Sequence, residues 1–187
     1  MSLALRDRED YEIIRGQIFM FARPSMKHVS ISGNVYAIFK RFLRGKTCKA
    51  YIEPDLFMDN DNNFIPDVVI LCDRDKLKPD GIYGAPDLVV EVLSPSTAKR
   101  DKTEKKDIYG QYGVREYWTI QPESKEITVY QNHNGLLEIS NIYYHRTEEE
   151  LNHMKEEDRK AIVPSLKVSI LEGFEISLAE VFEDLEQ

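Results

Sequence analysis

Two acidic residues lie inside the most apolar stretches of the sequence. Asp67 falls within residues 64–71 and Glu91 within residues 87–93, and near-continuous apolar runs of this kind are typical of strands buried on both faces. A buried carboxylate is costly unless it is paired, hydrogen-bonded or bound to a metal. If the strands are neighbours, both acids share one face and one edge of the sheet, a site suited to Mg²⁺ or Mn²⁺. The alternative is that each acid ends a strand and binds a nearby arginine or backbone N–H.

The helix predicted over residues 102–112 carries a lysine on its apolar side. Three residues follow Lys105 at spacings that keep them on its face of the helix: Ile108, Tyr109 and Tyr112. Because this stripe should face the sheet, Lys105 can reach back toward Glu91. The alternative is that Lys105 only extends past the tyrosines into solvent. Lys106 is rotated by about 100°, so we expect it to point outward and to contact phosphates.

Further elements are predicted around these residues. A hairpin is expected to turn at Gly16, a helix to open at Ser25 and to end near Gly45, and Asp101 to begin a capping box. The DNDNN run at residues 59–63 predicts a hairpin turn, since it lacks the glycine and the final glutamate of a calcium loop. Other strands are expected at 11–15, 17–21, 48–53, 56–59, 115–121, 126–131, 136–144 and 162–171, and weak or short helices at 147–160 and 177–185.

This order of elements predicts an α/β fold with a mixed central β-sheet flanked by helices. The chain has 187 residues, which fits one domain over residues 1–187. No stretch approaches the roughly 20 apolar residues of a membrane span, and the first ten residues turn charged too early for a signal peptide. Cys48 and Cys72 form no C-x-x-C pair, so we expect neither a disulfide scaffold nor a zinc ribbon, and a cytoplasmic protein.

Charge is distributed unevenly along the chain. The formal net charge is −8. Residues 146–187 carry 12 acidic and 5 basic residues, whereas residues 1–145 carry 21 acidic and 20 basic residues and are nearly neutral. Two basic clusters lie in the balanced part. They are Lys40, Arg41, Arg44, Lys46 and Lys49, and Lys99, Arg100, Lys102, Lys105 and Lys106. They are either solvated helix faces or local surfaces that bind a phosphate backbone.

Other catalytic patterns are missing from the sequence. The four histidines form no metal-ligand pair, and there is no G-x-S-x-G elbow, P-loop or G-x-G-x-x-G loop. The sequence therefore concentrates its chemistry on Asp67, Glu91 and Lys105.

Several motifs together resemble one protein family. They are PDVVIL, GAPDLVVEVLSPST, then Asp101, Lys105 and Tyr109, and GVREYW, with the N-terminal YEIIRGQIFMFARPSMKH. This combination resembles the Uma-two family, also called DUF820-like, which looks like a branch of the PD-(D/E)xK nuclease superfamily. The resemblance covers roughly residues 9–131 and implies a restriction-endonuclease-like fold.

The resemblance also implies roles for individual residues. The metal-binding acids map onto Asp67 and Glu91, with the backbone carbonyl of Val92 as a third ligand for Mg²⁺ or Mn²⁺. The superfamily lysine would stand at position 93, which is leucine here, and related branches supply it from the following helix, where Lys105 lies. Glu12 and His28 match family positions that would add a carboxylate and a proton-transfer group.

The expected function is metal-dependent hydrolysis of a DNA phosphodiester by a homodimer that binds DNA through its basic clusters. The alternative is a catalytically silent nucleic-acid-binding or protein-interaction domain on the same fold. The displaced lysine and the acidic net charge favour the silent domain, whereas the retained Asp67, Glu91 and Lys105 favour the enzyme.

Overall fold

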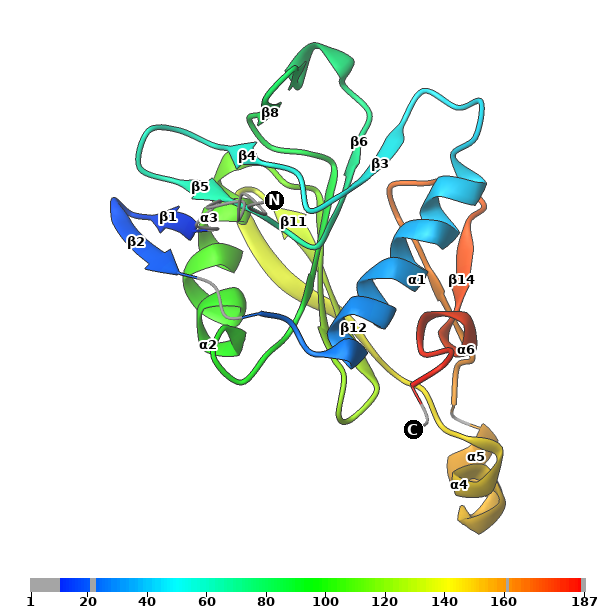
Figure 1. The fold of residues 1–187 in the computed structure, drawn as a ribbon. Helices are drawn as coiled ribbons and strands as arrows, with labels where there is room; N and C mark the ends of the chain where they lie inside the picture. Colours follow the sequence, from blue (N-terminus) through cyan, green and yellow to red (C-terminus); the bar gives the residue numbers. More distant parts are fainter. Residues whose placement is uncertain (1–10, 21–22, 161, 186–187) are drawn as a thin grey trace, which may run out of the picture.

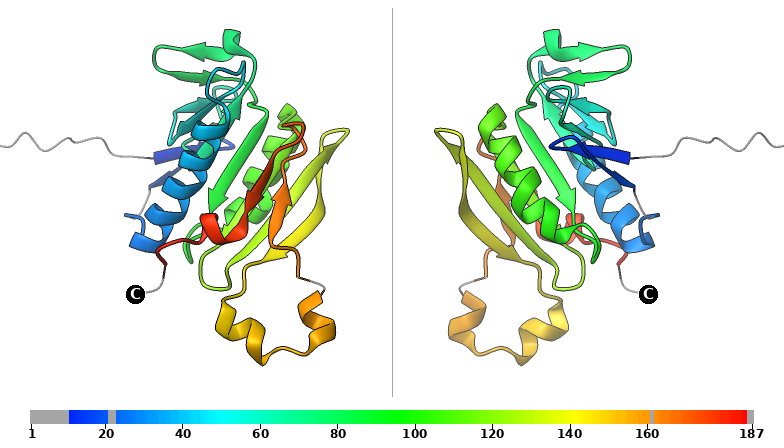
Figure 2. Two further views of the ribbon diagram at one scale, coloured as in Figure 1. Left: turned by 90° about the vertical axis from the view of Figure 1, so that its right-hand side faces the viewer. Right: turned by 90° about the vertical axis from the view of Figure 1, so that its left-hand side faces the viewer.

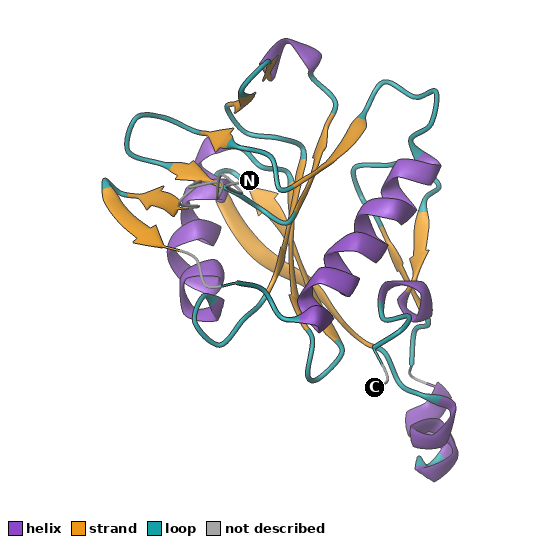
Figure 3. Ribbon diagram, viewed as in Figure 1, coloured by secondary structure: helices purple, strands orange, loops and turns teal. Residues whose placement is uncertain are grey.

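A computed structural model describes residues 11–20, 23–160 and 162–185 of the chain. Within these residues, a central six-stranded sheet lies between helices on its two faces (Figures 1 and 3). Its strand order is β12-β11-β10-β9-β6-β3, with β9 and β10 parallel and the other neighbours antiparallel. The strands are β3 (Lys49–Ile52), β6 (Val68–Leu71), β9 (Leu88–Val92), β10 (Glu116–Gln121), β11 (Glu126–His133) and β12 (Leu136–Tyr144).

One face of the central sheet packs against helix α1 (Met26–Phe42) and the C-terminal elements. The side chain of Ser25 caps the helix by accepting a hydrogen bond from the N–H of His28. The inward stripe of α1 includes Val35 and Phe39, which pack with Val90 and Trp118 of the sheet. The C-terminal elements are β13 (Ser165–Lys167), β14 (Glu175–Ser177) and α6 (Leu178–Val181).

The other face is covered by a second helical segment and a second sheet. The segment comprises α2 (Ala98–Arg100), the π-helical turn η2 (Asp101–Lys105) and α3 (Lys106–Tyr112). The second sheet has the order β2-β1-β5-β4-β8-β7. Its strands are β1 (Tyr11–Ile14), β2 (Gln17–Met20), β4 (Leu56–Phe57), β5 (Asn63–Phe64), β7 (Leu77–Lys78) and β8 (Gly81–Tyr83), and the 3₁₀ turn η1 (Arg74–Lys76) precedes β7. Phe64 and Tyr109 meet in the core between the sheets.

The remaining helices project from the body. The acidic segment forms α4 (Glu148–His153) and α5 (Glu156–Lys160), which stand away from the sheets in both views of Figure 2. Thr147 and Glu150 form a reciprocal capping box at the start of α4. Across the described ranges, none of the helices is both long and apolar enough to cross a membrane. The predicted mixed α/β architecture is confirmed, with the second sheet as an addition to the central one.

The stretch 64–71 is not one strand, as the sequence predicts, but two that belong to different sheets. Phe64 ends β5 and Val68 begins β6, and Pro66 lies between them. Proline has no N–H to donate to a ladder, so it interrupts strand pairing here. Asp67 therefore directly precedes β6. The strand predicted at 162–171 is shorter in the structure, where residues 165–167 form a strand. The predicted end of the first hairpin, at Phe21, falls outside the described residues.

The helix after β9 begins one turn earlier than predicted, at Ala98. Asp101 is therefore no capping residue, and its side chain is buried inside the helical segment. Lys106 is more exposed than Lys105, as predicted, with 25% of its side chain exposed against 3%, but it also packs against the protein. Its ammonium lies 5.9 Å from the ring centroid of Tyr130 and donates to the carbonyl of Leu137 at 3.4 Å. Both sides of α3 are packed, because Gly110 lies so close to the β11–β12 turn that a Cβ would come within 2.8 Å of the Gly135 carbonyl oxygen.

The two cysteines form a disulfide, although the sequence predicts no disulfide scaffold. The antiparallel register pairs Lys49 with Leu71, so the next position along sets Cys48 opposite Cys72. The two sulfurs are bonded, and the Cα atoms lie 3.9 Å apart. The sequence separation of 24 residues hides this contact, which only strand pairing brings about.

Candidate active site

Asp67 and Glu91 come from neighbouring strands and lie on the same face of the central sheet. The antiparallel register pairs Val68 with Val90, and continuing it by one residue sets Asp67 opposite Glu91. Side chains alternate along a strand, so both acids share the face of Val89, which packs under the α3 segment. The structure thus brings together the two acids that the sequence predicts to share a site.

The carboxylate of Asp67 is held at both oxygens. Its Oδ1 lies 2.6 Å from Nε2 of His28, and its Oδ2 accepts a hydrogen bond from the N–H of Val92 at 2.6 Å. Burial alone would lower the pKa of His28, but the hydrogen bond and the charge of Asp67 outweigh it and raise that pKa. Nδ1 of His28 is buried and finds no hydrogen-bond partner among the described residues. His28 thus joins the site from the first turn of α1.

Lys105 lies in a buried pocket of carboxylates. Its Nζ is 2.7 Å from Oε1 of Glu91, 2.8 Å from Oε1 of Glu12 and 3.4 Å from Oδ1 of Asp101. Lys105 is 3% exposed, and the three acids are 2–5% exposed. Glu12 comes from β1, and Asp101 stands four residues before Lys105 in the helical segment. Three segments distant in sequence, β1, β9 and the helical segment that carries Asp101 and Lys105, therefore meet at one ammonium.

Burial and the excess of acid shift the pKa values in this pocket. Burial raises the pKa of Glu91 well above its usual range; Lys105 opposes this, and the charges of Asp101, Glu12 and Asp67 add to it. Burial alone would lower the pKa of Lys105, but Glu12, Glu91 and Asp101 raise it well above its usual range. Lys105 is thus a charged ammonium, and one ammonium does not neutralise three carboxylates.

Two buried tyrosines fix the acids of the pocket. The hydroxyl of Tyr109 donates to Oε1 of Glu91 at 2.9 Å, and that of Tyr117 donates to the backbone carbonyl of Asp101 at 3.0 Å. Sequence reasoning missed Asp101 as a residue of the site. Its spacing of four from Lys105 was the available signal, because residues i and i+4 share a helix face. The spacing has this meaning only if residue 101 is already helical, and the sequence predicts a helix that begins at residue 102.

The charges of the site favour a divalent cation. The set contains four buried or nearly buried carboxylates: Glu12, Asp67, Glu91 and Asp101. Among the described residues, Lys105 and His28 are the basic residues in contact with them. With every group ionised, four negative and two positive charges leave an excess of two negative charges. A buried excess of this kind is costly unless a cation offsets it or a carboxyl group takes up a proton, and the raised pKa of Glu91 favours such protonation in the metal-free protein.

The donor atoms also suit magnesium. Mg²⁺ prefers oxygen ligands and is commonly bound through one or two carboxylates together with water. Asp67 and Glu91 provide such a pair. The N–H of Val92 points at Asp67, and because a residue's N–H and C=O lie on the same edge of a strand, its carbonyl faces that side too. In the part of the chain that the structure describes, no three His, Cys, Asp or Glu side chains are grouped as ligands. The residues therefore fit Mg²⁺ in donor type and in charge, through a pair of carboxylates.

The predicted basic clusters lie in different places. The first is at the far end of α1, where Arg41 pairs with Glu180 and Lys46 lies over the ring of Phe42. At 1.5 Å per residue, Arg41 is about 20 Å along the helix from His28. The second cluster adjoins the site. There Lys99 and Lys102 are exposed and Arg100 stacks on the ring of Phe19, while Lys105 is part of the buried pocket.

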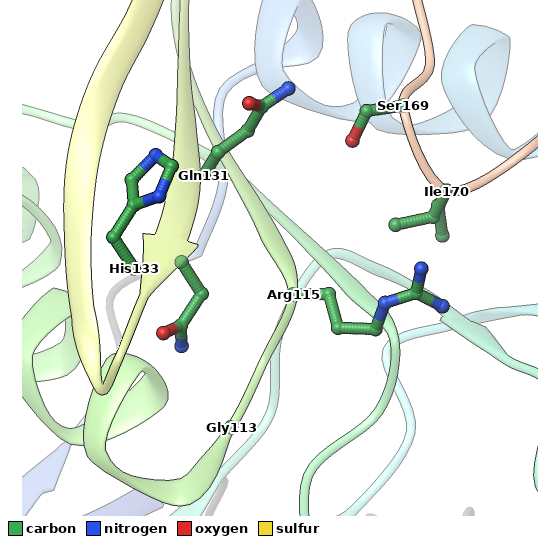
Figure 4. A pocket seen from close by; sticks show the side chains of 7 residues that line it. Gly113, Arg115, Gln131, His133, Ser169 and Ile170 are labelled. Atoms are coloured by element: carbon green, nitrogen blue, oxygen red, sulfur yellow. The ribbon is translucent and has the colours of Figure 1, made fainter.

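A hollow of about 380 Å³ lies at the other end of the strands. It is lined by Gly113, Arg115, Gln131, Asn132, His133, Ser169 and Ile170 (Figure 4). Arg115 contacts Asp87, just before β9 begins, whereas Glu91 lies near the end of that strand. The hollow is therefore separate from the acid pair.

Sequence and fold comparisons identify the relatives of this chain. Residues 2–158 match the Uma2 family, described as "Putative restriction endonuclease". The chain belongs to the Uma2 family. An uncharacterized protein of Synechocystis is 32% identical over 133 residues, which are 69% of this chain and 70% of that protein.

The fold has a solved relative. This Uma2 chain resembles the crystal structure of "a putative nuclease belonging to DUF820" from Anabaena variabilis, with a TM-score of 0.70 and 20% identity over 93% of this chain and 90% of that one. At this identity the likeness shows the fold. The restriction-endonuclease-like α/β fold expected from the sequence is thereby confirmed, and the family points to a nuclease.

Proposed function

We propose that this Uma2 protein is a metal-dependent endonuclease that hydrolyses DNA phosphodiester bonds. The observation that carries the proposal is the buried set of four carboxylates against one lysine and one histidine, with Asp67 and Glu91 side by side. Groups whose pKa values are shifted by burial and by neighbouring charges concentrate at functional sites. Membership of a family described as "Putative restriction endonuclease" supports the same reaction class.

Asp67, Glu91 and the carbonyl of Val92 would hold Mg²⁺ or Mn²⁺. When bound, the metal supplies a Lewis acid that lowers the pKa of water and offsets charge on the phosphate in the transition state. Both described contacts of Glu91 use Oε1, so its Oε2 can serve the metal while Lys105 stays in place.

The remaining residues have distinct tasks in this proposal. Lys105 orients the attacking water or steadies the developing negative charge, as a preorganised electrostatic group. His28 holds Asp67 in position through Nε2 and would serve as the proton-transfer group at that nitrogen. Glu12 holds Lys105 at 2.8 Å and so sets the direction of the ammonium. Each task uses a contact already present in the folded chain.

DNA would approach from the side of the second basic cluster. Lys99 and Lys102 are exposed on the helix that carries Lys105, and contacts from such residues to phosphates position a duplex without reading its bases. We expect a homodimer, because cleavage of both strands needs two sites.

One observation favours the non-catalytic alternative. The acids around Lys105 are already satisfied by an ammonium, and no three-ligand group occurs among the residues with a described position. A silent domain that binds nucleic acid or protein would keep such a pocket for stability.

Metal titration separates the two candidates. We expect the wild type to bind Mn²⁺ at one site by calorimetry and Asp67→Asn to lose that binding while keeping its circular dichroism spectrum. Asp158→Asn, an exposed change in α5, is the matched control and should bind as the wild type does. Equal Mn²⁺ affinity in the wild type and Asp67→Asn would contradict the assignment.

Nicking of supercoiled plasmid with Mg²⁺ or Mn²⁺ tests the reaction. Lys105→Ala should lower the rate by about 100-fold or more, the scale for loss of one preorganised group. Lys106→Ala, its neighbour outside the acid pocket, should change the rate only a few-fold. Metal binding without nicking by the wild type would favour the silent domain, and similar losses in both variants would overturn the role of Lys105.

A further inference from the structure

The outer face of the first hairpin is apolar. Pairing of β1 with β2 sets Tyr11 opposite Met20 and Ile13 opposite Ile18, so these four side chains share one face. The opposite face carries Glu12, which contacts Lys105. Tyr11, Ile18 and Met20 are 46, 65 and 57% exposed. The inner face also carries Ile14, which is 1% exposed, and Phe19, which packs against the core, so the hairpin is largely apolar on both faces and its outer apolar side chains lie uncovered.

The apolar face continues across the second sheet. Ile13 pairs with Asn63, Asn63 with Phe57, and Phe57 with Tyr83, and directly paired residues lie on the same face. The rings of Phe57 and Tyr83 lie 4.8 Å apart, and Tyr83 is 43% exposed. We name this surface the outer face; its apolar members are Tyr11, Ile13, Ile18, Met20, Phe57 and Tyr83.

The size of the outer face fits the centre of a protein interface. Aromatic side chains have roughly 150–250 Å² of surface to bury. At that size, the four side chains that are about half exposed have on the order of 400 Å² of exposed surface between them. They are Tyr11, Ile18, Met20 and Tyr83. Contiguous patches of that size on a soluble protein are often functional. A standard interface buries about 800 Å² per partner, with an apolar centre inside a polar rim. The outer face supplies such a centre.

The rim of the outer face carries both signs of charge. Arg15 and Lys78 are exposed at its turns and edge, and so are Asp61 and Asp80. The acids at the rim disfavour a phosphate backbone, which is bound by basic surfaces. A two-fold axis sets the same patch of each copy against itself, and a rim with both signs can then form opposite-charge pairs.

We propose that the outer face is the interface of a homodimer, with a second copy of this chain packed on it about a two-fold axis. Among the described residues, the ladder between the hairpin and the rest of its sheet has one residue pair, Ile13 with Asn63, and the N–H groups of Arg15 and Gly16 add hydrogen bonds to Asn62 and Asp61. A partner on the outer face would hold the hairpin from outside and thereby keep Glu12 against Lys105. This consequence for the site rests on the proposed function, whereas the interface itself does not.

The oligomeric state of hairpin variants tests the interface. We expect sedimentation velocity at about 50 µM to give a dimer for the wild type and a monomer for Ile18→Asp/Met20→Asp, with the same circular dichroism spectrum. The matched control is Leu136→Asp/Ile139→Asp on β12, where the native side chains are 64 and 58% exposed. The control should remain a dimer.

A second measurement covers the case in which the hairpin variant fails to fold. Amide hydrogen exchange of the wild type in β1, β2 and β8 should slow as protein concentration rises from about 1 to 100 µM, while exchange in β12 stays unchanged. A monomeric wild type, a dimer that persists in the folded hairpin variant, or concentration-independent exchange would each overturn the interface. A wild type that is monomeric and cleaves DNA would refute the proposed interface and leave the proposed nuclease function in place. A wild type that is dimeric but neither binds metal nor cleaves DNA would refute the nuclease function and leave the interface in place.

Discussion

Replacement of Lys105 by methionine removes the ammonium and keeps most of the length of the side chain. In the wild type this group lies 2.7–3.4 Å from the carboxylates of Glu91, Glu12 and Asp101. The variant leaves these three acids together in a pocket where each is at most 5% exposed. We therefore expect the metal-free protein to lose stability at neutral and alkaline pH.

Removal of one partner from a buried ion pair costs roughly 3–5 kcal/mol. For a chain of this size, about 2–4 °C of Tm accompany each kcal/mol, so Tm should fall by roughly 6–20 °C at pH 8. The loss should be smaller at pH 5. The pKa of Glu91 is already raised well above its usual range, and without Lys105 protonation of the acids removes the uncompensated charge.

Thermal and urea unfolding of the metal-free proteins at pH 5 and pH 8 measure this effect. Lys106→Met is the matched control, because Lys106 makes a long hydrogen bond of 3.4 Å to Leu137 and should cost about 1 kcal/mol or less. Mn²⁺ should raise the Tm of Lys105→Met more than that of the wild type, since a cation then offsets more charge. A Tm change of less than 2 °C at pH 8, or an equal change in both lysine variants, would refute the electrostatic reasoning.

Two further outcomes follow from the same contacts. Tyr109→Phe removes the hydroxyl that donates to Glu91 at 2.9 Å, and urea unfolding should show a loss of about 1.5–3 kcal/mol, the range for hydrogen bonds to charged groups; an unchanged midpoint would show that the bond is not needed. The raised pKa of His28 stabilises the fold fully below the unfolded value of 6.5, and this contribution is lost as pH rises through the higher folded value. The stability of the wild type relative to His28→Gln should therefore decrease from pH 6 to pH 9, and parallel curves would exclude a charged His28–Asp67 pair.

The sequence by itself determined the elements whose residue patterns are local. The hairpin at Gly16, the helix capped by Ser25 and the strand at 88–92 follow from turn residues, capping and continuous apolar runs. The acids Asp67 and Glu91 stood out because a carboxylate in an apolar strand needs a partner. Family resemblance, rather than periodicity, pointed to Glu12 and His28, and the structure brings Glu12 to Lys105 and His28 to Asp67.

Tertiary structure decided what depends on contacts between distant segments. Pro66 could be read in the sequence, but the assignment of Phe64 and Val68 to different sheets follows from pairing with other strands. The bond between Cys48 and Cys72 depends on the register of β3 with β6. Asp101 joined the site because packing extended the helix to Ala98 and turned residues 101 and 105 toward the same buried acids. Local propensities cannot fix such contacts, because their free energy comes from burial and charge that exist only once the sheets have assembled.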